Sequence, residues 1–163
     1  MSHSWHDEGQ GKWDALRNWA DGFEAASEGR SPTLWLDKAC IDQKDIDASL
    51  AGLPIFLSAC EMLLVLAGES YITRLWCVVE LFVFVQMGGT NERIRIMDIG
   101  ADRAAFRKFD ASRAQAFLAR DRHKLLGVIE ASFGELTPFN QAVRRVFANH
   151  EGTLGSPGGS RHG

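Results

Sequence analysis

The residue in this sequence most suggestive of chemistry is Glu80, which lies within the apolar run Trp-Cys-Val-Val-Glu-Leu-Phe-Val-Phe-Val. If the run is helical, Trp76 lies one turn earlier on the same face. Carboxylates are rarely buried without a partner, because removing the charge from water is costly, and a carboxylate in such a setting often marks a functional site. The alternative is a structural role, with Glu80 partly exposed or paired with Arg74 or Lys38. Composition alone favours this structural role, since structural ion pairs also perturb carboxylates.

Other reactive residue types form weaker patterns. His3 and His6 are close in sequence, but two histidines without a third ligand do not predict a metal site. The cysteines Cys40, Cys60 and Cys77 form no Cys-x-x-Cys pair, so we expect neither a zinc site nor a disulfide framework. A reducing compartment is the setting that this pattern favours. Cys77 has no histidine partner nearby in sequence, and we interpret it as a buried, unreactive thiol.

Composition limits the class of protein. The chain has 163 residues, a length typical of one domain, with 45% hydrophobic and 24% charged residues and a net charge of -3. No block of Lys or Arg is present, so we expect no nucleic-acid partner. The two longest apolar stretches, residues 53–67 and 75–87, each contain a glutamate and are shorter than the roughly 20 residues of a membrane span. With no apolar leader sequence at the N-terminus, we expect a cytoplasmic protein without membrane contact.

Short apolar runs alternate with segments of helical periodicity along the chain. The runs at residues 33–37, 62–67 and 94–98 predict strands. Helices are expected at about residues 13–29, 48–60, 73–87 and 139–148, with one or two more within residues 111–130. Trp13, Trp19 and Trp35 are expected in the core. Strands that are apolar on both faces and alternate with helices predict a parallel sheet covered on both sides. Ligands bind such sheets at the carboxyl ends of the strands, which here are followed by residues 2–8, 38–46 and 69–76.

The order of several motifs resembles the Toll/interleukin-1 receptor (TIR) domain family. Leu-Trp-Leu-Asp-Lys at 34–38 is followed by a polar loop, a helix, Leu-Leu-Val-Leu at 63–66 and Arg-Leu-Trp-Cys-Val-Val-Glu-Leu at 74–81. The leading Ser-His-Ser-Trp-His-Asp at 2–7 resembles the family's first box, and residues 38–46 fall where its BB loop lies. Trp-Cys-x-x-Glu-Leu resembles the start of the third helix in plant and bacterial-type TIR domains. The likeness covers residues 2–99.

The resemblance implies a doubly wound, flavodoxin-like α/β fold, a three-layer sandwich formed by residues 1–150. Residues 151–163 are rich in Gly and Ser and are expected to be a disordered tail. In the family a first strand precedes the first box, whereas this chain begins at Met1. We therefore expect that central strand to lie upstream, and the chain without it to be marginally stable or prone to aggregation. The loop at 38–46 also differs from the family, because it carries Cys40 and lacks a common glycine.

In the enzymatic branch of the family the domain cleaves NAD at the nicotinamide–ribose bond, and the residue matching Glu80 is catalytic. A fixed anion beside the ribose would stabilise an oxocarbenium-like transition state. NAD would then be a substrate, and no cofactor or metal is implied. The resemblance also implies a substrate-binding set, comprising Trp76, Ser4, Trp5, Asp7 and Lys38. The alternative is a non-catalytic signalling adaptor that acts by association with itself or with other TIR domains, and the sequence leaves both open.

Overall fold

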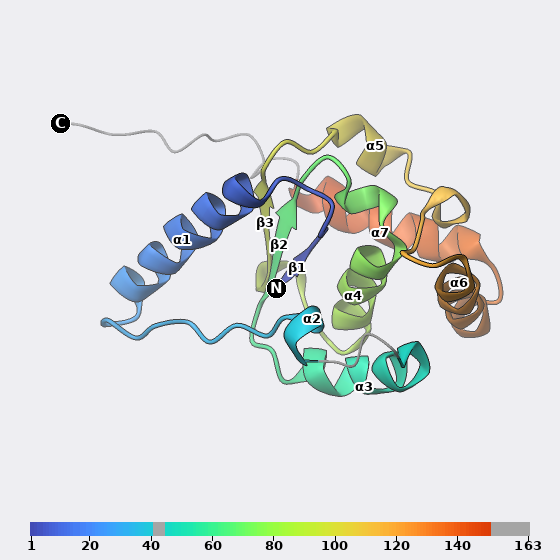
Figure 1. Cartoon of the computed structure of the whole chain (residues 1–163), viewed down its shortest axis with the longest axis horizontal. Helices are drawn as coiled ribbons and strands as arrows, with labels where there is room; N and C mark the ends of the chain where they lie inside the picture. Colours follow the sequence, from blue (N-terminus) through green and yellow to red (C-terminus); the bar gives the residue numbers. More distant parts are fainter. Residues whose placement is uncertain (41–44, 151–163) are drawn as a thin grey trace.

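The computed structural model describes residues 1–40 and 45–150, apart from the side chains of Lys38 and Ile46. The expected loop at 41–44 and the expected tail at 151–163 lie outside this described part. In chain order the strands and helices are β1 (Ser2–His3), α1 (Gly9–Ala26), α2 (Asp37–Cys40), α3 (Ile46–Ser58), β2 (Leu63–Ala67), α4 (Leu75–Gln86), β3 (Ile94–Asp98), α5 (Arg103–Arg107), α6 (Ala119–Phe133) and α7 (Leu136–His150). Figure 1 shows their arrangement. Short 3-10 turns occur at Tyr71–Thr73, Asn91–Arg93 and Ala111–Arg113.

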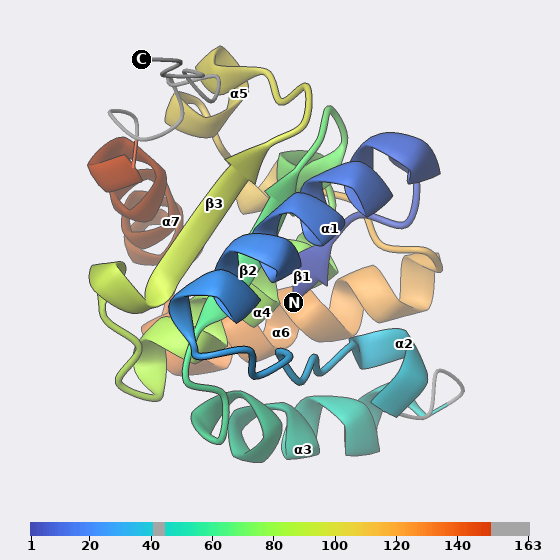
Figure 2. The ribbon, with the colours of Figure 1, turned by 90° about the vertical axis from the view of Figure 1, so that its left-hand side faces the viewer.

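The three strands form a parallel sheet in the order β1-β2-β3, with Ser2 opposite Val65 and Leu63 opposite Ile94. Every residue of β2 is buried, as expected for a strand that is covered on both faces. Figure 2 shows α1 in front of the sheet and α4 and α6 behind it. The predicted α/β class, the parallel pairing and the strands near 62–67 and 94–98 are therefore confirmed.

Two predictions about strands were wrong. Residues 33–36 form no strand, and Asp37 begins helix α2 instead of ending a strand. The segment runs beside the start of the chain, where the amino group of Met1 donates to the Trp35 carbonyl oxygen over 2.7 Å. In addition, the start of the chain was expected to hold no strand, yet Ser2 and His3 pair with β2. Because β1 is only two residues long, it offers residues 33–36 little backbone with which to form a ladder.

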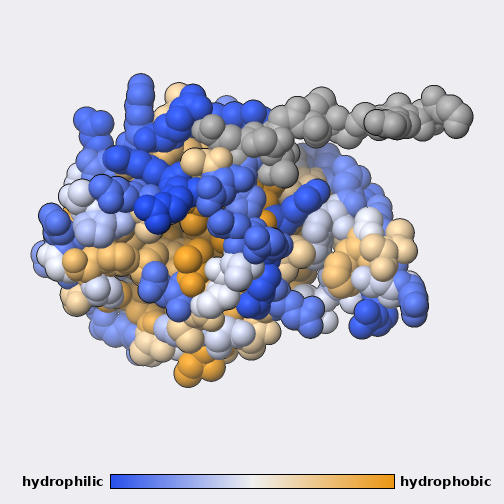
Figure 3. Space-filling view, turned by 180° about the vertical axis from the view of Figure 1, so that it is seen from behind, coloured by the Kyte–Doolittle hydropathy of each residue, from blue (hydrophilic) through white to orange (hydrophobic). Residues whose placement is uncertain are grey.

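Helix α1 is less buried than its pattern of apolar residues predicted. None of its residues is buried, and the Trp13 side chain is 54% exposed. Trp19 and Trp35 are half-buried, so the expectation that all three tryptophans lie in the core was wrong. A sheet of three strands gives a helix on its outer face only a narrow surface to pack on. Figure 3, seen from behind the view of Figure 1, shows apolar residues mixed with polar ones over the back of the molecule.

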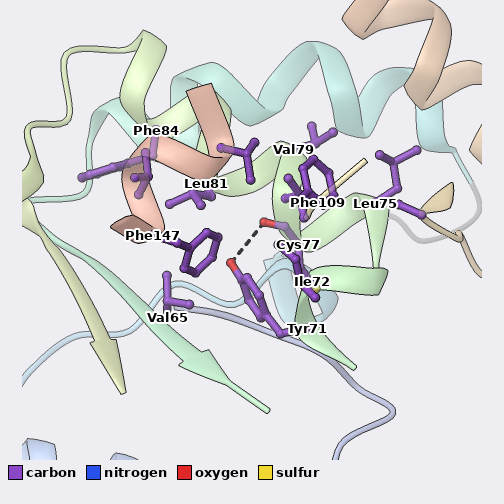
Figure 4. Packing of buried hydrophobic residues seen from close by; sticks show 14 of the residues in the cluster. Val65, Tyr71, Ile72, Leu75, Cys77, Val79, Leu81, Phe84, Phe109 and Phe147 are labelled. Carbon is purple, nitrogen blue, oxygen red and sulfur yellow. Dashed lines mark hydrogen bonds between the residues drawn. The ribbon is translucent and has the colours of Figure 1, made fainter. Parts of the chain in front are cut away.

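The main core lies on the other side of the sheet, where α4 packs against β1 and α3, α6 and α7 pack against α4. Aromatic rings fill it, with Phe106 stacked on Phe147 at 4.0 Å and Phe82 against Phe139 at 5.1 Å between ring centroids. Figure 4 shows the Val65 side chain, which comes from β2, on the face of the sheet where the Phe147 ring lies. This core holds α4 in place behind β1 and β2. None of the described helices combines the length and the apolar character that a membrane span requires.

Candidate functional site

Glu80 lies in the second turn of α4, the most apolar helix of the core. The helix begins at Leu75, immediately after the 3-10 turn that follows β2. Val79 and Leu81, on either side of Glu80, are buried, and Glu80 itself is only 2% exposed. The alternative in which Glu80 is partly exposed is therefore wrong. Burying a carboxyl group at this position is costly unless hydrogen bonds or protonation compensate.

A short chain of hydroxyl groups reaches the carboxyl group of Glu80. The Ser2 hydroxyl donates to Glu80 Oε2 over 2.6 Å, and Ser2 Oγ lies 3.0 Å from the Tyr71 hydroxyl. The Tyr71 hydroxyl in turn donates to the Cys77 carbonyl oxygen over 3.2 Å, as Figure 4 shows. The other carboxyl oxygen, Glu80 Oε1, has no hydrogen-bond partner among the described residues. One oxygen is thus anchored and the other is left without a partner.

The surroundings of Glu80 favour its protonated form. Burial, followed by the negative charge of Asp37 at the start of α2, raises the pKa of Glu80 from 4.5 to about 8. The hydrogen bond from Ser2, then the positive charge of the Met1 amino group, and most weakly the Trp76 side chain as a donor lower this pKa. The geometry between Trp76 and Glu80 is too poor for a regular hydrogen bond, since Trp76 Nε1 and Glu80 Oε1 both lack one. Among the described side chains no ion pair joins Glu80 to Arg74, while the Lys38 side chain lies outside them. Near neutral pH the ligand-free carboxyl group is therefore mostly uncharged.

A second polar group lies at the carboxyl ends of β1 and β2. The Ser4 hydroxyl is 2.6 Å from the Ser70 hydroxyl, and the Ser70 backbone N–H donates to Asp7 Oδ1 over 2.8 Å. Asp7 Oδ2 is buried without a partner among the described residues. It lies so close to Gly68 that a Cβ there would be 2.3 Å away, so any other residue at this position would displace the Asp7 side chain. Ser4 and Asp7 are thus brought together at the edge where parallel sheets bind ligands.

Trp5 extends from this edge toward solvent and is 48% exposed. Its ring contacts the His3 ring at 4.2 Å, and the Lys12 ammonium group lies 5.9 Å from its centroid. Lys12 also donates to the Ser4 carbonyl oxygen over 2.9 Å. Burial, followed by the charge of Lys12, lowers the pKa of His3 to about 4, so His3 is neutral near pH 7. An exposed aromatic ring with a cation beside it is a surface on which a planar ring could stack.

The predicted site residues therefore separate into different environments. Glu80 is in the interior, Ser4 and Asp7 lie at the strand ends, and Trp5 lies at the surface. Trp76 is half-buried one turn from Glu80, and its Nε1 has no hydrogen-bond partner in the described structure. The side chain of Lys38 is outside the described residues.

Sequence reasoning did not identify Ser2, Tyr71 and Asp37 as neighbours of Glu80. Ser2 is 78 residues away along the chain, and only the parallel pairing of β1 with β2 brings it to α4. The one signal in the sequence was the position of Ser2 in the motif that resembles the family's first box.

The remaining reactive side chains lie away from solvent or apart from one another. The Cys77 thiol is buried and donates to the His3 carbonyl oxygen over 3.3 Å, and burial raises the pKa of this thiol well above its ordinary value. Such a thiol is a poor nucleophile. Within residues 1–40 and 45–150 no group of three or more metal-ligating side chains occurs.

The arrangement can supply a carboxylate with one free oxygen in an apolar setting, next to an aromatic side chain. Such a carboxylate can stabilise a positive charge that develops beside it. Comparison of the chain with profiles of known protein families, with curated proteins and with solved structures finds no match.

Proposed function

We propose that this domain has the flavodoxin-like, TIR-type fold and cleaves NAD at the nicotinamide–ribose bond, with Glu80 as the catalytic carboxylate. The observation that carries the proposal is Glu80 Oε1, a buried carboxyl oxygen without a partner among the described residues. The parallel sheet with helices on both faces supports the fold. The order of motifs from residue 2 to residue 99 supports the activity.

Cleavage of the nicotinamide–ribose bond requires a fixed anion next to the ribose. When the bond between ribose C1′ and the nicotinamide nitrogen breaks, the electron pair stays with nicotinamide, which leaves as a neutral molecule. The ribose becomes oxocarbenium-like, and the Glu80 carboxylate stabilises its positive charge. A water molecule then adds to C1′ and loses a proton, which gives ADP-ribose.

Because Glu80 is buried, its carboxyl group must lose a proton before it can act as the anion in this reaction. With a pKa of about 8, the ligand-free carboxyl group is mostly neutral at pH 7. The pyridinium ring of NAD is positively charged, so its binding nearby favours loss of the proton from Glu80. Since Glu80 is almost wholly buried, neighbouring side chains must move before a ligand reaches Oε1. NAD binding therefore combines a local rearrangement with proton release.

The test is to incubate the purified protein with NAD and to quantify nicotinamide and ADP-ribose by chromatography. The protein is assayed both dilute and clustered on an oligomeric scaffold, because the resemblance implies that assembly controls activity. The proposal predicts equal amounts of the two products from the clustered protein. Folded, clustered protein that releases no nicotinamide would contradict it.

A signalling adaptor is the second candidate, and exposed apolar residues on α3 favour it. Ile55 is 72% exposed, and Phe56, which stacks on Trp35 at 5.7 Å, is 38% exposed. Exposed apolar groups of this kind are common where proteins associate. Self-association in light scattering that grows with concentration, together with no NAD cleavage, would favour the adaptor over the enzyme.

A further inference from the structure

Three buried side chains from three separate segments form one hydrogen-bonded chain around Glu80. Ser2 comes from β1, Tyr71 from the 3-10 turn after β2, and Glu80 from α4. Ser2 Oγ lies 2.6 Å from Glu80 Oε2 and 3.0 Å from the Tyr71 hydroxyl. The carbonyl oxygen of Cys77 is within reach of both hydroxyl groups, at 3.5 Å from Ser2 Oγ and 3.2 Å from Tyr71.

This chain can satisfy both protonation states of Glu80. Each hydroxyl group has one proton to donate and can also accept. When Glu80 is ionised, Tyr71 donates to Ser2 and Ser2 donates to Glu80 Oε2. When Glu80 is protonated, its O–H donates to Ser2, while Ser2 and Tyr71 donate onward toward the Cys77 carbonyl oxygen. The same heavy-atom positions serve both states, so the carboxyl group need not move when it gains or loses a proton.

We propose that Ser2 is a positioning residue for Glu80. Its hydroxyl group holds Oε2 and reverses its hydrogen-bond direction together with Tyr71, which leaves Oε1 to meet a ligand. The role of this arrangement in NAD cleavage rests on the proposed function, whereas the hydrogen-bonded chain itself does not.

Several titratable groups influence Glu80 besides Ser2 and Tyr71, and a test must separate their effects from that of Ser2. Asp37 from α2 raises the pKa of Glu80 and the amino group of Met1 lowers it, while Glu80 in turn raises the pKa of Cys77 in α4. Removing the Ser2 hydroxyl leaves all of these groups in place. A change in the titration of Glu80 after Ser2→Ala therefore reports on the hydrogen bond.

The experiment is an NMR titration of the glutamate side-chain carboxyl carbons, in which Glu80→Gln assigns the signal of Glu80. In Ser2→Ala both forms of Glu80 lose a hydrogen bond, but the bond to the ionised form is charge-assisted and about twice as strong, so we expect the pKa of Glu80 to rise by roughly one unit. Tyr71→Phe removes the donor behind Ser2, and a smaller rise is expected. The matched control is Ser4→Ala, a buried serine two residues away that bonds to Ser70 and should leave the titration of Glu80 unchanged.

Two further variants keep the test decisive. Ser2→Thr retains a hydroxyl group and should titrate like the natural protein. If Ser2→Ala does not fold, Ser2→Cys carries only a weak donor and should move the pKa of Glu80 in the same upward direction. An unchanged titration of Glu80 in folded Ser2→Ala or Ser2→Cys would overturn the proposal.

An activity measurement separates this inference from the proposed function. If NAD is cleaved, the rise of kcat/KM with pH should shift to higher pH in Ser2→Ala, in step with the NMR titration. If none of the proteins cleaves NAD, the proposed function fails, and the titration still decides whether Ser2 positions Glu80.

Discussion

Replacing Glu80 with glutamine should change how the stability of the domain depends on pH. The pKa of Glu80 is about 8 in the folded protein, raised chiefly by burial, against an ordinary value of 4.5. Between these values the folded protein keeps a proton that the unfolded chain releases, so the contribution of Glu80 is complete below pH 4.5 and is lost as the pH rises through 8. The loss is about 1.4 kcal/mol per pH unit and at most about 5 kcal/mol across the window.

Glutamine has the shape of the protonated carboxyl group and no charge to lose. It can still accept the hydrogen bond from Ser2, and no ion pair with a described residue is broken. The stability of Glu80→Gln relative to the natural protein should therefore rise by about 4 kcal/mol between about pH 5 and about pH 9. Groups such as His3 titrate in both proteins and largely cancel in the difference.

The assay is urea denaturation of both proteins at several pH values across this range. The control is Glu130→Gln, which removes an exposed carboxylate from α6 and should show a nearly constant difference. If the stability difference between Glu80→Gln and the natural protein did not change with pH, Glu80 would not be a buried carboxyl group with a raised pKa.

Three further predictions follow from the same structure. If the ionised carboxyl group is required, kcat/KM for NAD should rise about tenfold per pH unit below pH 8 and level off above it; a flat profile would contradict this. Gly68→Ala should destabilise the fold by about 1–3 kcal/mol, because its Cβ would clash with Asp7, whereas Gly127→Ala in α6 meets open space and should stabilise it by up to about 1 kcal/mol; thermal melting of the two variants should show opposite signs. Iodoacetamide should modify the exposed Cys40 well before the buried Cys77, and mass spectrometry showing the reverse order would place Cys77 at the surface.

The elements that depend on local apolar patterns were predicted well from the sequence. Leu63–Ala67 is a continuous apolar run that is buried along its whole length, whereas Ile94–Asp98 alternates the buried Ile94 and Ile96 with more exposed residues. Residues 33–36 have a similar composition but form no strand, because a strand also needs a partner and β1 offers two residues. Strand pairing depends on the whole sheet, so the composition of residues 33–36 alone could not predict whether they form a strand.

The same distinction applies to the candidate site. The apolar residues around Glu80 in the sequence predicted an unusual environment for a carboxyl group, and Glu80 is indeed buried in the structure. The identity of its partners depends on contacts across the sheet: Ser2 reaches Glu80 only through β1, and Asp37 affects it only because α2 lies nearby. For Trp13 the prediction failed in the other direction. Its place on the apolar face of a helix predicted that it is buried, but it is exposed, because the narrow sheet does not cover it.

The most direct test of the central claim measures nicotinamide release from NAD and the melting temperature on the same preparations of the natural protein and Glu80→Gln, at pH 7 and with both proteins clustered. We expect Glu80→Gln to melt at the same or a higher temperature and to lose activity by about 10²-fold or more, the scale of removing one preorganised electrostatic group. A Glu80→Gln protein that melts clearly lower and cleaves NAD as fast per folded molecule would show that Glu80 serves the structure and not the reaction.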